Sequence, residues 1–254
     1  MSELTHRLDV ELVARSLARS RGQARDLVKA GAVLVDGSPA TKISTPVRAV
    51  QSLELVSGVE GWVSRAACKL VAALETFGLE GPHGHHGLRV DGKRCFDVGA
   101  CTGGFTQVLL REGAREVVAL DVGHGQLAEK LRGDARITAL EGINARHLDA
   151  ASLPVPRFDL IVGDLSFISL SLVLPALAPL LGGTLLMLVK PQFELQPADI
   201  GKGGLVKDPA AYARVEARLR EACAALRLNV VDWFDSPIAG GDGNREFFLQ
   251  AHHE

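Results

Sequence analysis

Short apolar runs punctuate the chain from about residue 93 onward, and longer amphipathic or polar stretches separate them. The runs lie within RCFDVG, EVVALDV, RITALEG, FDLIVGDL, TLLMLVK, NVVDWFD and REFFLQA. Such alternation is typical of parallel strands buried between helices. We predict an α/β fold with a doubly wound, mostly parallel sheet of seven strands and helical stretches between the first six. Ligands are expected beyond the carboxyl ends of the strands.

The first sixty residues have a different pattern. Leu8, Leu12 and Leu17 recur at helical spacing, and Ser20 with Gln23 fits a capping box that would begin a second helix, which ends at Gly31. The segment AVLVDGSPATKI is typical of a hairpin that turns at DG. We predict a small α+β module of two helices and a hairpin over residues 1–60, a linker near residues 57–62, and a second domain over residues 61–254.

Composition and charge narrow the class of protein. Hydrophobic residues make up 47% and charged residues 23% of the 254 residues, which argues against extended disorder, and the net charge of -2 shows no overall preference for a polyanion. The charge distribution is more informative, because residues 15–29 hold five basic residues against Asp26 alone. A locally basic helix pair indicates contact with nucleic acid. The basic residues are Arg15, Arg19, Arg21, Arg25 and Lys29.

Several site classes are not expected. The beginning of the sequence lacks the apolar core of a signal peptide, and no uncharged run is long enough for a membrane helix, so we expect a cytoplasmic protein with no membrane partner. The four cysteines form no CxxC pair, so neither a zinc knuckle nor a disulfide framework is indicated. His83, His85 and His86 lie in a polar loop without cysteine or carboxylate neighbours, so we expect no metal.

The segment CFDVGACTGGFTQVLL has the pattern of a strand, a glycine-rich turn and a helix. A dinucleotide fingerprint, GxGxxG, would need glycine where Cys101 stands, so the turn favours a ligand without a pyrophosphate. Asp97 can stabilise a cationic group nearby, and the ammonium and sulfonium charges of S-adenosylmethionine suit this better than NAD does.

Two further strand ends extend this predicted cofactor site. Asp121 follows Gly99 by 22 residues, a spacing at which an acidic side chain binds ribose hydroxyls, although it could instead cap the following helix. Asn144, Ala145 and Arg146 follow the third strand and could flank adenine, although an asparagine there is equally common in a plain turn. The candidate cofactor-binding residues are Asp97, Gly99, Ala100, Thr102, Gly103, Gly104, Phe105, Asp121, Asn144, Ala145 and Asp164.

The segment LLMLVKPQFE places Lys190 at the end of the apolar fifth strand. The stretch after the fourth strand, DLSF, lacks the prolines of an amine methyltransferase motif, and no cysteine stands where cytosine C5 chemistry would need a nucleophile. A hydroxyl acceptor requires a base, and a desolvated or crowded lysine can serve as one. We expect Lys190 in that role with Asp164, Glu246 and Lys69 nearby, although each alone could be an ordinary surface charge.

These residues resemble a known family. The set Lys69, Asp164, Lys190 and Glu246, with the segment DVGACTGGF, resembles the Lys-Asp-Lys-Glu tetrad and cofactor turn of the FtsJ-type ribose 2′-O-methyltransferases. The segment RLDVELVARSLARSRGQARDLVKAGAVLVDG resembles the small RNA-binding module of a small-subunit ribosomal protein, pseudouridine synthases and tyrosyl-tRNA synthetases. The combination is similar to the TlyA family, bacterial rRNA cytidine-2′-O-methyltransferases also labelled hemolysin A.

The resemblance implies a Rossmann-like class I methyltransferase fold that uses S-adenosyl-L-methionine and methylates cytidine ribose in rRNA of the small or large ribosomal subunit, or of both. It implies that Lys190 is the general base, that Lys69, Asp164 and Glu246 orient it, and that the loop at residues 201–204 brings Lys202 and Lys207 near phosphates. RNA backbone contacts would come from Arg7, Arg15, Arg19, Arg21, Arg25 and Lys29. Two alternatives stay open: a membrane-active hemolysin, and an RNA-binding protein with an inactive methyltransferase domain.

Overall fold

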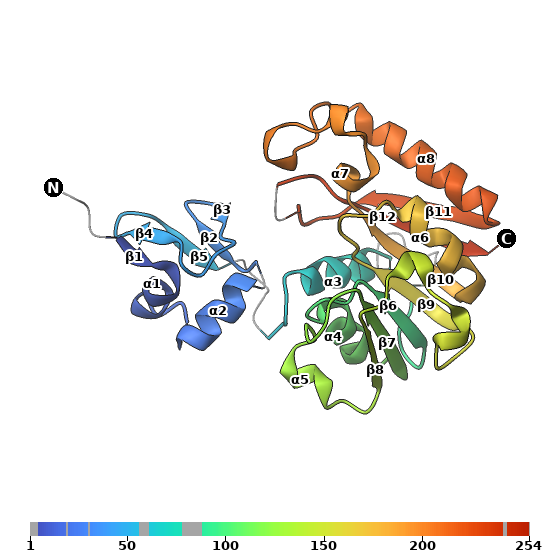
Figure 1. Cartoon of the computed structure of the whole chain (residues 1–254), viewed down its shortest axis with the longest axis horizontal. Helices are drawn as coiled ribbons and strands as arrows, with labels where there is room; N and C mark the ends of the chain where they lie inside the picture. The colour runs from blue at the N-terminus through green and yellow to red at the C-terminus, as the bar shows by residue number, and fades with distance from the viewer. Residues whose placement is uncertain are drawn as a thin grey trace. The chain divides into compact units, whose positions relative to one another are not determined.

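The structure is a computed structural model that describes residues 5–18, 20–29, 31–55, 61–77, 88–240 and 243–253. The chain divides into two units, Met1–Cys68 and Lys69–Glu254, coloured from blue to red in Figure 1. The predicted boundary after residue 60 and the loop that carries His83, His85 and His86 lie outside the described residues.

The first unit contains the two helices and the hairpin that the sequence predicts. Its helices are α1 (Leu8–Ala14) and α2 (Arg21–Lys29), and a three-stranded antiparallel sheet has the order β3 (Ser38–Pro39), β2 (Val33–Val35) and β5 (Leu53–Leu55). The pairing of β1 (Thr5–Arg7) with β4 (Pro46–Arg48) was not predicted. Strands of three residues are too short to show an alternating pattern, so the sequence carried no signal for them.

Two glycines and one aspartate fix the turns of this unit. Gly31 has a φ of +67°, and the N–H groups of Gly31 and Ala32 donate to the carbonyls of Val28 and Leu27, which ends α2 in a Schellman motif. Asp36 and Gly37 both have positive φ angles, +51° and +75°, as a type I′ hairpin turn requires. The predicted helix end and the predicted turn are therefore confirmed.

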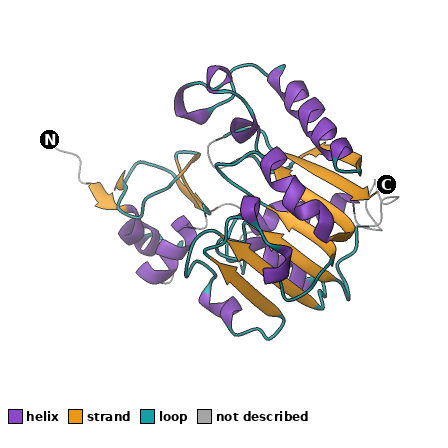
Figure 2. Ribbon diagram, turned by 45° about the vertical axis from the view of Figure 1, so that its right-hand side comes forward, coloured by secondary structure: helices purple, strands orange, loops and turns teal. Residues whose placement is uncertain are grey.

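The second unit is built on a mostly parallel sheet of seven strands, as predicted (Figure 2). The sequence did not predict which strand is reversed; it is β12, which pairs antiparallel with both of its neighbours. The carboxyl ends of β10, β9 and β6 lie next to one another at one edge of this sheet. In spatial order the strands are β11 (Leu228–Asp235), β12 (Phe247–His253), β10 (Leu181–Val189), β9 (Phe158–Gly163), β6 (Arg94–Val98), β7 (Glu116–Asp121) and β8 (Ile137–Glu141).

Helices join most of these strands, with one exception. No α-helix connects β8 to β9; two 3₁₀ turns, η2 (Ala145–His147) and η3 (Ala150–Ser152), take its place. The segment between η3 and β9, LPVPR, holds two prolines, which disfavour a helix there. The α-helices are α3 (Ala66–Phe77), α4 (Gly104–Arg111), α5 (Glu129–Arg132), α6 (Leu170–Leu177), α7 (Pro191–Glu194) and α8 (Ala211–Ala225).

The main core lies on one face of the sheet, where α6 and α8 pack. Alternate residues of β6 divide between the two faces, because side chains of a strand point to opposite sides in turn. Phe96 and Val98 belong to the core shared with α6 and α8, whereas Cys95 and Asp97 do not. Asp97 therefore points toward the other face, just before the strand ends in the glycine-rich turn.

Candidate active site

The glycine-rich turn lies close against the end of β9. Gly99 has a φ of +84°, and a Cβ atom there would lie 3.0 Å from both the Asp164 carbonyl oxygen and Leu165 Cδ2. Gly103 has a φ of +90° and precedes α4, and a Cβ atom there would lie 2.5 Å from Leu131 Cδ1. Both positions require glycine for conformation as well as for space. The result is a backbone turn placed at the carboxyl ends of β6 and β9.

Asp97 is a buried carboxylate with an unused acceptor. It is 1% exposed, and Thr106 Oγ1 donates to its Oδ2 at 2.6 Å. Its Oδ1 accepts no hydrogen bond from any described residue. Burial raises the pKa of this carboxyl from 3.8 to about 7, and the hydrogen bond from Thr106 opposes the rise. A cationic group placed at Oδ1 would satisfy the unused acceptor and stabilise the ionised form.

Asp121 and Asn144 are both engaged with backbone N–H groups. Asp121 Oδ2 accepts from Cys101 N at 2.8 Å, and Oδ1 accepts from Gly123 N at 2.7 Å. Asp121 is thus bonded to the glycine-rich turn, and the next helix, α5, begins only at Glu129. The Asn144 side chain accepts from Arg146 N at 3.0 Å and caps η2, which is the plain-turn arrangement.

Two ion pairs bring the four predicted catalytic residues together. Lys190 Nζ lies 2.6 Å from Asp164 Oδ1 and donates to Ser166 Oγ at 2.8 Å. Lys69 of α3 forms a hydrogen-bonded ion pair with Glu246, which directly precedes β12, and both side chains are buried.

The two pairs also interact with each other. Burial raises the pKa of Glu246 above its ordinary value, whereas the positive charges of Lys69 and Lys190 lower it and the negative charge of Asp164 raises it further. Glu246 is therefore within electrostatic reach of the other three residues. The four side chains, which come from α3 and from the ends of β9, β10 and the loop before β12, form one charged cluster.

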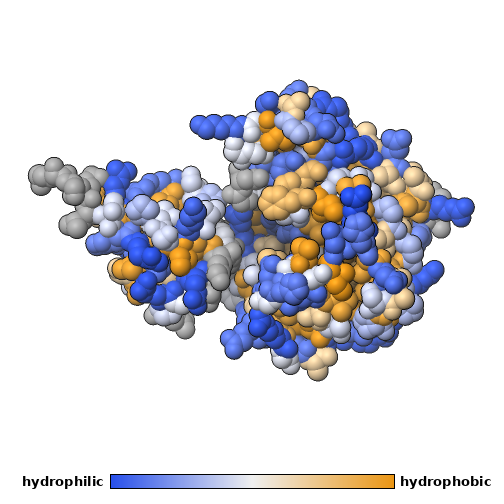
Figure 3. All heavy atoms as spheres, in the orientation of Figure 1, coloured by the Kyte–Doolittle hydropathy of each residue, from blue (hydrophilic) through white to orange (hydrophobic). Residues whose placement is uncertain are grey.

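A cavity of about 570 Å³ lies between η2 and the segments that follow β9 and β10, and none of the four cluster residues lines it. Phe167 is 89% exposed, and its ring centroid lies 4.9 Å from that of Phe193. Figure 3 shows apolar side chains reaching the surface of this unit among hydrophilic ones. The cavity is lined by Asn144, Arg146, His147, Phe167, Ile168, Ser169, Leu172 and Phe193.

Two buried polar residues at this edge of the sheet were not predicted. Glu194 accepts hydrogen bonds from the start of α6, and the Asn244 side chain bonds Val206 N at 3.0 Å and the Gly204 carbonyl at 2.9 Å. Neither has a chemical motif of its own in the sequence. The available signal was a carboxylate after apolar residues in LVKPQFE and an asparagine in a glycine-rich segment, GGDGNREFF.

The two hydrogen bonds of Asn244 hold the loop at residues 201–207, which also has hydrogen bonds of its own. Gly201 N donates to the Leu205 carbonyl at 2.7 Å, and Lys207 Nζ donates to the Ala198 carbonyl at 2.9 Å. Lys202 and Lys207 are both exposed, and the bond to Ala198 ties Lys207 to the turn that precedes the loop.

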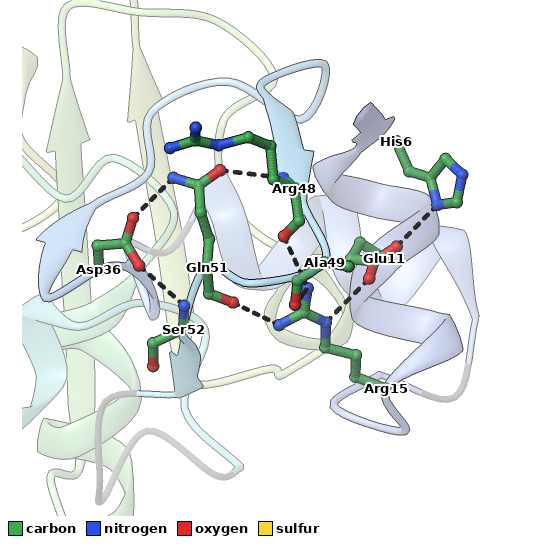
Figure 4. Close-up of polar contacts among 8 residues, drawn as sticks. All are labelled: His6, Glu11, Arg15, Asp36, Arg48, Ala49, Gln51 and Ser52. Carbon is green, nitrogen blue, oxygen red and sulfur yellow. Dashed lines mark hydrogen bonds and ion pairs between the residues drawn. The ribbon is translucent and has the colours of Figure 1, made fainter. Parts of the chain in front are cut away.

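The predicted RNA-binding arginines of the first unit differ in their surroundings. Arg15 binds Glu11 at 2.9 Å and donates to the Gln51 and Arg48 carbonyls at 2.6 and 3.1 Å, so it holds a loop against α1 (Figure 4). Arg7, Arg21 and Arg25 are exposed. Arg19 and the side chain of Lys29 lie outside the described part of the chain.

Arg7 and Arg21 share one buried carboxylate. Arg7 Nε lies 3.0 Å from Asp9 Oδ1, and an Arg21 terminal nitrogen lies 2.8 Å from Asp9 Oδ2. The hydrogen bond from Arg7 is the main cause that lowers the pKa of Asp9 to about 2. The sequence pattern showed the arginines but not this shared partner.

Within the described residues, no cluster of three or more histidine, cysteine, aspartate or glutamate side chains could hold a metal ion. A membrane-spanning helix would have to be longer and more apolar than any helix described here.

Comparison with known proteins agrees with this architecture. Residues 62–253 match the model of the FtsJ-like methyltransferases, and residues 6–50 match the S4 domain. The chain is 48% identical to the 16S/23S rRNA (cytidine-2′-O)-methyltransferase TlyA of Mycobacterium tuberculosis, over 96% of this chain and 88% of that protein. It is 35% identical to Hemolysin A of Brachyspira hyodysenteriae, over 95% and 97% of the two chains.

A solved structure from Streptococcus thermophilus that carries a hemolysin name is 35% identical and has a TM-score of 0.73. The match covers 98% of this chain and 89% of that one. The predicted methyltransferase fold and the preceding RNA-binding type of module are confirmed. The chain therefore belongs to the FtsJ-like methyltransferase family and, within it, to the TlyA proteins, with an S4 domain ahead of the methyltransferase domain.

Proposed function

We propose that the protein transfers a methyl group from S-adenosyl-L-methionine to the 2′-hydroxyl of a cytidine in ribosomal RNA, of the small or large subunit or of both. The observation that carries the proposal is the Lys190–Asp164 ion pair, which lies at the carboxyl ends of adjacent strands beside the glycine-rich turn. The names of the TlyA relatives support this substrate. Such an enzyme would act in the cytoplasm, where ribosomes are made.

The glycine-rich turn fits the proposed cofactor. Asp97 Oδ1 offers a buried acceptor for the amino group of S-adenosylmethionine, and Cys101 stands where a pyrophosphate-binding turn would need glycine. Asp121 would hold the ribose hydroxyls with the lone pairs that its two backbone hydrogen bonds leave over, and Ala145 with Asn144 would flank the adenine. Bound here, the cofactor supplies an electrophilic methyl group on a sulfonium.

The charged cluster supplies the base that a hydroxyl acceptor needs. Lys190 Nζ would accept the hydroxyl proton that the ribose must lose to become methylated. Asp164 and Ser166 fix the position of Lys190 Nζ from two sides, and the Lys69–Glu246 pair holds a second ammonium beside it.

A substitution of Lys190 tests this assignment. Lys190→Ala should abolish methylation of ribosomal RNA by the purified protein, measured by mapping ribose methylation, while calorimetry still detects S-adenosylmethionine binding. Lys93→Ala is the matched control, because Lys93 directly precedes β6 at the opposite, amino edge of the same sheet and should keep its activity. Full activity in Lys190→Ala would refute the role of this residue.

The two domains divide the work in this proposal. Residues 1–60 would bind RNA, with Arg7, Arg21 and Arg25 directed to the phosphate backbone, and residues 61–254 would carry the chemistry. Two results would favour the alternatives instead. Calorimetry without S-adenosylmethionine binding would indicate an inactive methyltransferase domain, and leakage of liposomes at low protein concentration would indicate a membrane-active protein.

A further inference from the structure

The carboxylate of Glu194 is buried four residues beyond Lys190. Glu194 ends α7, the short helix for which Lys190 is the N-terminal flanking residue, and it is 3% exposed. The proposed reaction assigns it no part, since it belongs to neither ion pair of the charged cluster. A carboxylate this deeply buried needs hydrogen bonds to offset its desolvation.

Its hydrogen bonds come from α6 and α8. Leu170 N donates to Oε1 at 2.6 Å, and Ser169 Oγ donates to Oε2 at 2.6 Å. Arg218 of α8 completes an ion pair with Oε2. Ser169 caps α6 and Leu170 is its first residue, so Glu194 binds the beginning of the helix that follows Asp164.

The segments after β9 and β10 are therefore joined at both of their ends. At the strand ends, Lys190 binds Asp164 and Ser166; at the helix ends, Glu194 binds Ser169 and Leu170. The two segments are short, residues 164–170 and 190–194, so a shift at the Glu194 end would be felt at the Lys190 end. The Phe167 and Phe193 rings meet between the two attachments.

A strained residue lies within the same joined segments. Phe167 has a φ of +63°, in the left-handed region that a bulky side chain adopts only under strain. Such a conformation persists only where the surroundings hold the backbone on both sides. Asp164 is held on one side by Lys190, and Ser169 and Leu170 are held on the other by Glu194.

We propose that Glu194 is a positioning residue for methyl transfer, which holds the segments after β9 and β10 in the register that places Lys190 Nζ against Asp164 and Ser166. It would act through these segments and would not touch the substrate. The inference rests on the proposed function, because it assigns Lys190 a role in the reaction. A displacement of about 1 Å in a reacting group can lower a rate about a hundredfold, so a loss of this register should be visible in the turnover number.

Glu194→Ala and Glu194→Gln test the proposal, assayed below the melting temperature of each variant. In Glu194→Ala we expect kcat to fall about tenfold or more, while KM for RNA and the Kd for S-adenosylmethionine change by less than about threefold. Glu194→Gln keeps an oxygen that can accept from Leu170 N and should recover part of kcat. The control is Asp199→Asn, which breaks an ion pair with Arg214 of the same α8 and should leave kcat unchanged.

A second readout does not depend on the reaction. Trace acetylation of lysines with acetic anhydride, quantified by mass spectrometry, should label Lys190 several-fold faster in Glu194→Ala, with exposed Lys202 as the internal reference. If the wild type methylates no RNA but this labelling still rises, the positioning holds and the proposed function fails. If Glu194→Ala is folded and both kcat and Lys190 labelling match the wild type, the positioning role is refuted.

A variant that does not fold leaves the test intact, because Ser169→Ala removes a single donor and makes a smaller change. Ser169→Ala should show a weaker form of both effects, a lower kcat and faster labelling of Lys190. Wild-type values for both in Ser169→Ala and in Glu194→Gln would refute the proposal equally.

Discussion

Asp9 and Asp97 are both almost fully buried carboxylates, yet the two units treat them in opposite ways. Asp9 is bound by two arginines, and the pKa of its carboxyl falls to about 2. Asp97 has one hydroxyl donor and an unused oxygen, and burial raises the pKa of its carboxyl to about 7. A buried carboxylate that is paired with arginines, as Asp9 is, stabilises the fold of its own unit. One that is buried without a cation is costly for the fold and suited to a positively charged ligand.

The largest effect should follow from Asp97→Asn. The substitution keeps the size of the side chain and removes the negative charge that the amino group of S-adenosylmethionine would meet. Hydrogen bonds to charged groups contribute about 1.5–3 kcal/mol, so calorimetry should show affinity reduced about 10- to 100-fold. Asp159→Asn, at an exposed position of β9, is a control that should bind like the wild type. Unchanged affinity in Asp97→Asn would place the cofactor elsewhere.

The affinity should also depend on pH, with a sign set by the raised pKa of Asp97. Below about pH 7 this carboxyl is protonated in the folded protein, so a cationic ligand must first displace its proton. Affinity for S-adenosylmethionine should therefore rise by up to about tenfold per pH unit toward pH 7 and level off above it. The slope should disappear in Asp97→Asn. Thr106→Val, which removes the donor to the charged form, should move the plateau to higher pH.

The same carboxyl gives the protein without ligand a stability that falls with pH. In the unfolded chain Asp97 ionises near 3.8, whereas in the fold it keeps its proton to about 7. The folded state binds more protons between these values, so the free energy of unfolding should decrease from about pH 4 to pH 7 and then stop changing on account of this group. Thermal unfolding measured with and without S-adenosylmethionine would show whether the bound ligand abolishes this decrease in the free energy of unfolding.

Turns and strand ends could be predicted from the sequence more reliably than contacts between residues far apart in the chain. Lys190 and Asp164 each end an apolar run, and parallel strands bring such ends to one edge, so their proximity was predictable. The turns at Gly31 and Gly37 were predictable because only a few residues adopt a positive φ easily. These features are local or follow from the regular geometry of a sheet.

Contacts that depend on the exact packing of two distant segments could not be predicted. Glu194 meets the beginning of α6, 24 residues earlier in the chain, through a packing of helices that no local pattern encodes. Arg15 was a reasonable candidate for RNA because its charge is visible in sequence, whereas its bonds to carbonyls 33 and 36 residues away are not. The connection between β8 and β9 is a different case, because the sequence did carry a signal. Its two prolines argued against a helix, but the regular alternation of strands and helices led us to predict one.

Asp9→Asn removes both ion pairs of Asp9 at once. The substitution removes the charge that Arg7 and Arg21 share in a buried position, so the first unit should lose stability while cofactor affinity stays unchanged. Hydrogen exchange measured by mass spectrometry on the full chain should show faster exchange in peptides from α1 and α2. Exchange equal to the wild type there would mean that the buried carboxylate contributes nothing to this unit.

The smallest effect should come from removing one arginine of that set. Arg7→Gln leaves Arg21 on Asp9, so at neutral pH the exchange of α1 should increase less than it does in Asp9→Asn. The lowered pKa of Asp9 means that its ionised form stabilises the fold above about pH 4 and that this contribution is lost as pH falls toward about 2. The difference between Arg7→Gln and wild type should therefore shrink over that range, because a protonated Asp9 no longer pairs with either arginine. A difference that persists at pH 2 would show that Arg7 stabilises α1 through some contact other than Asp9.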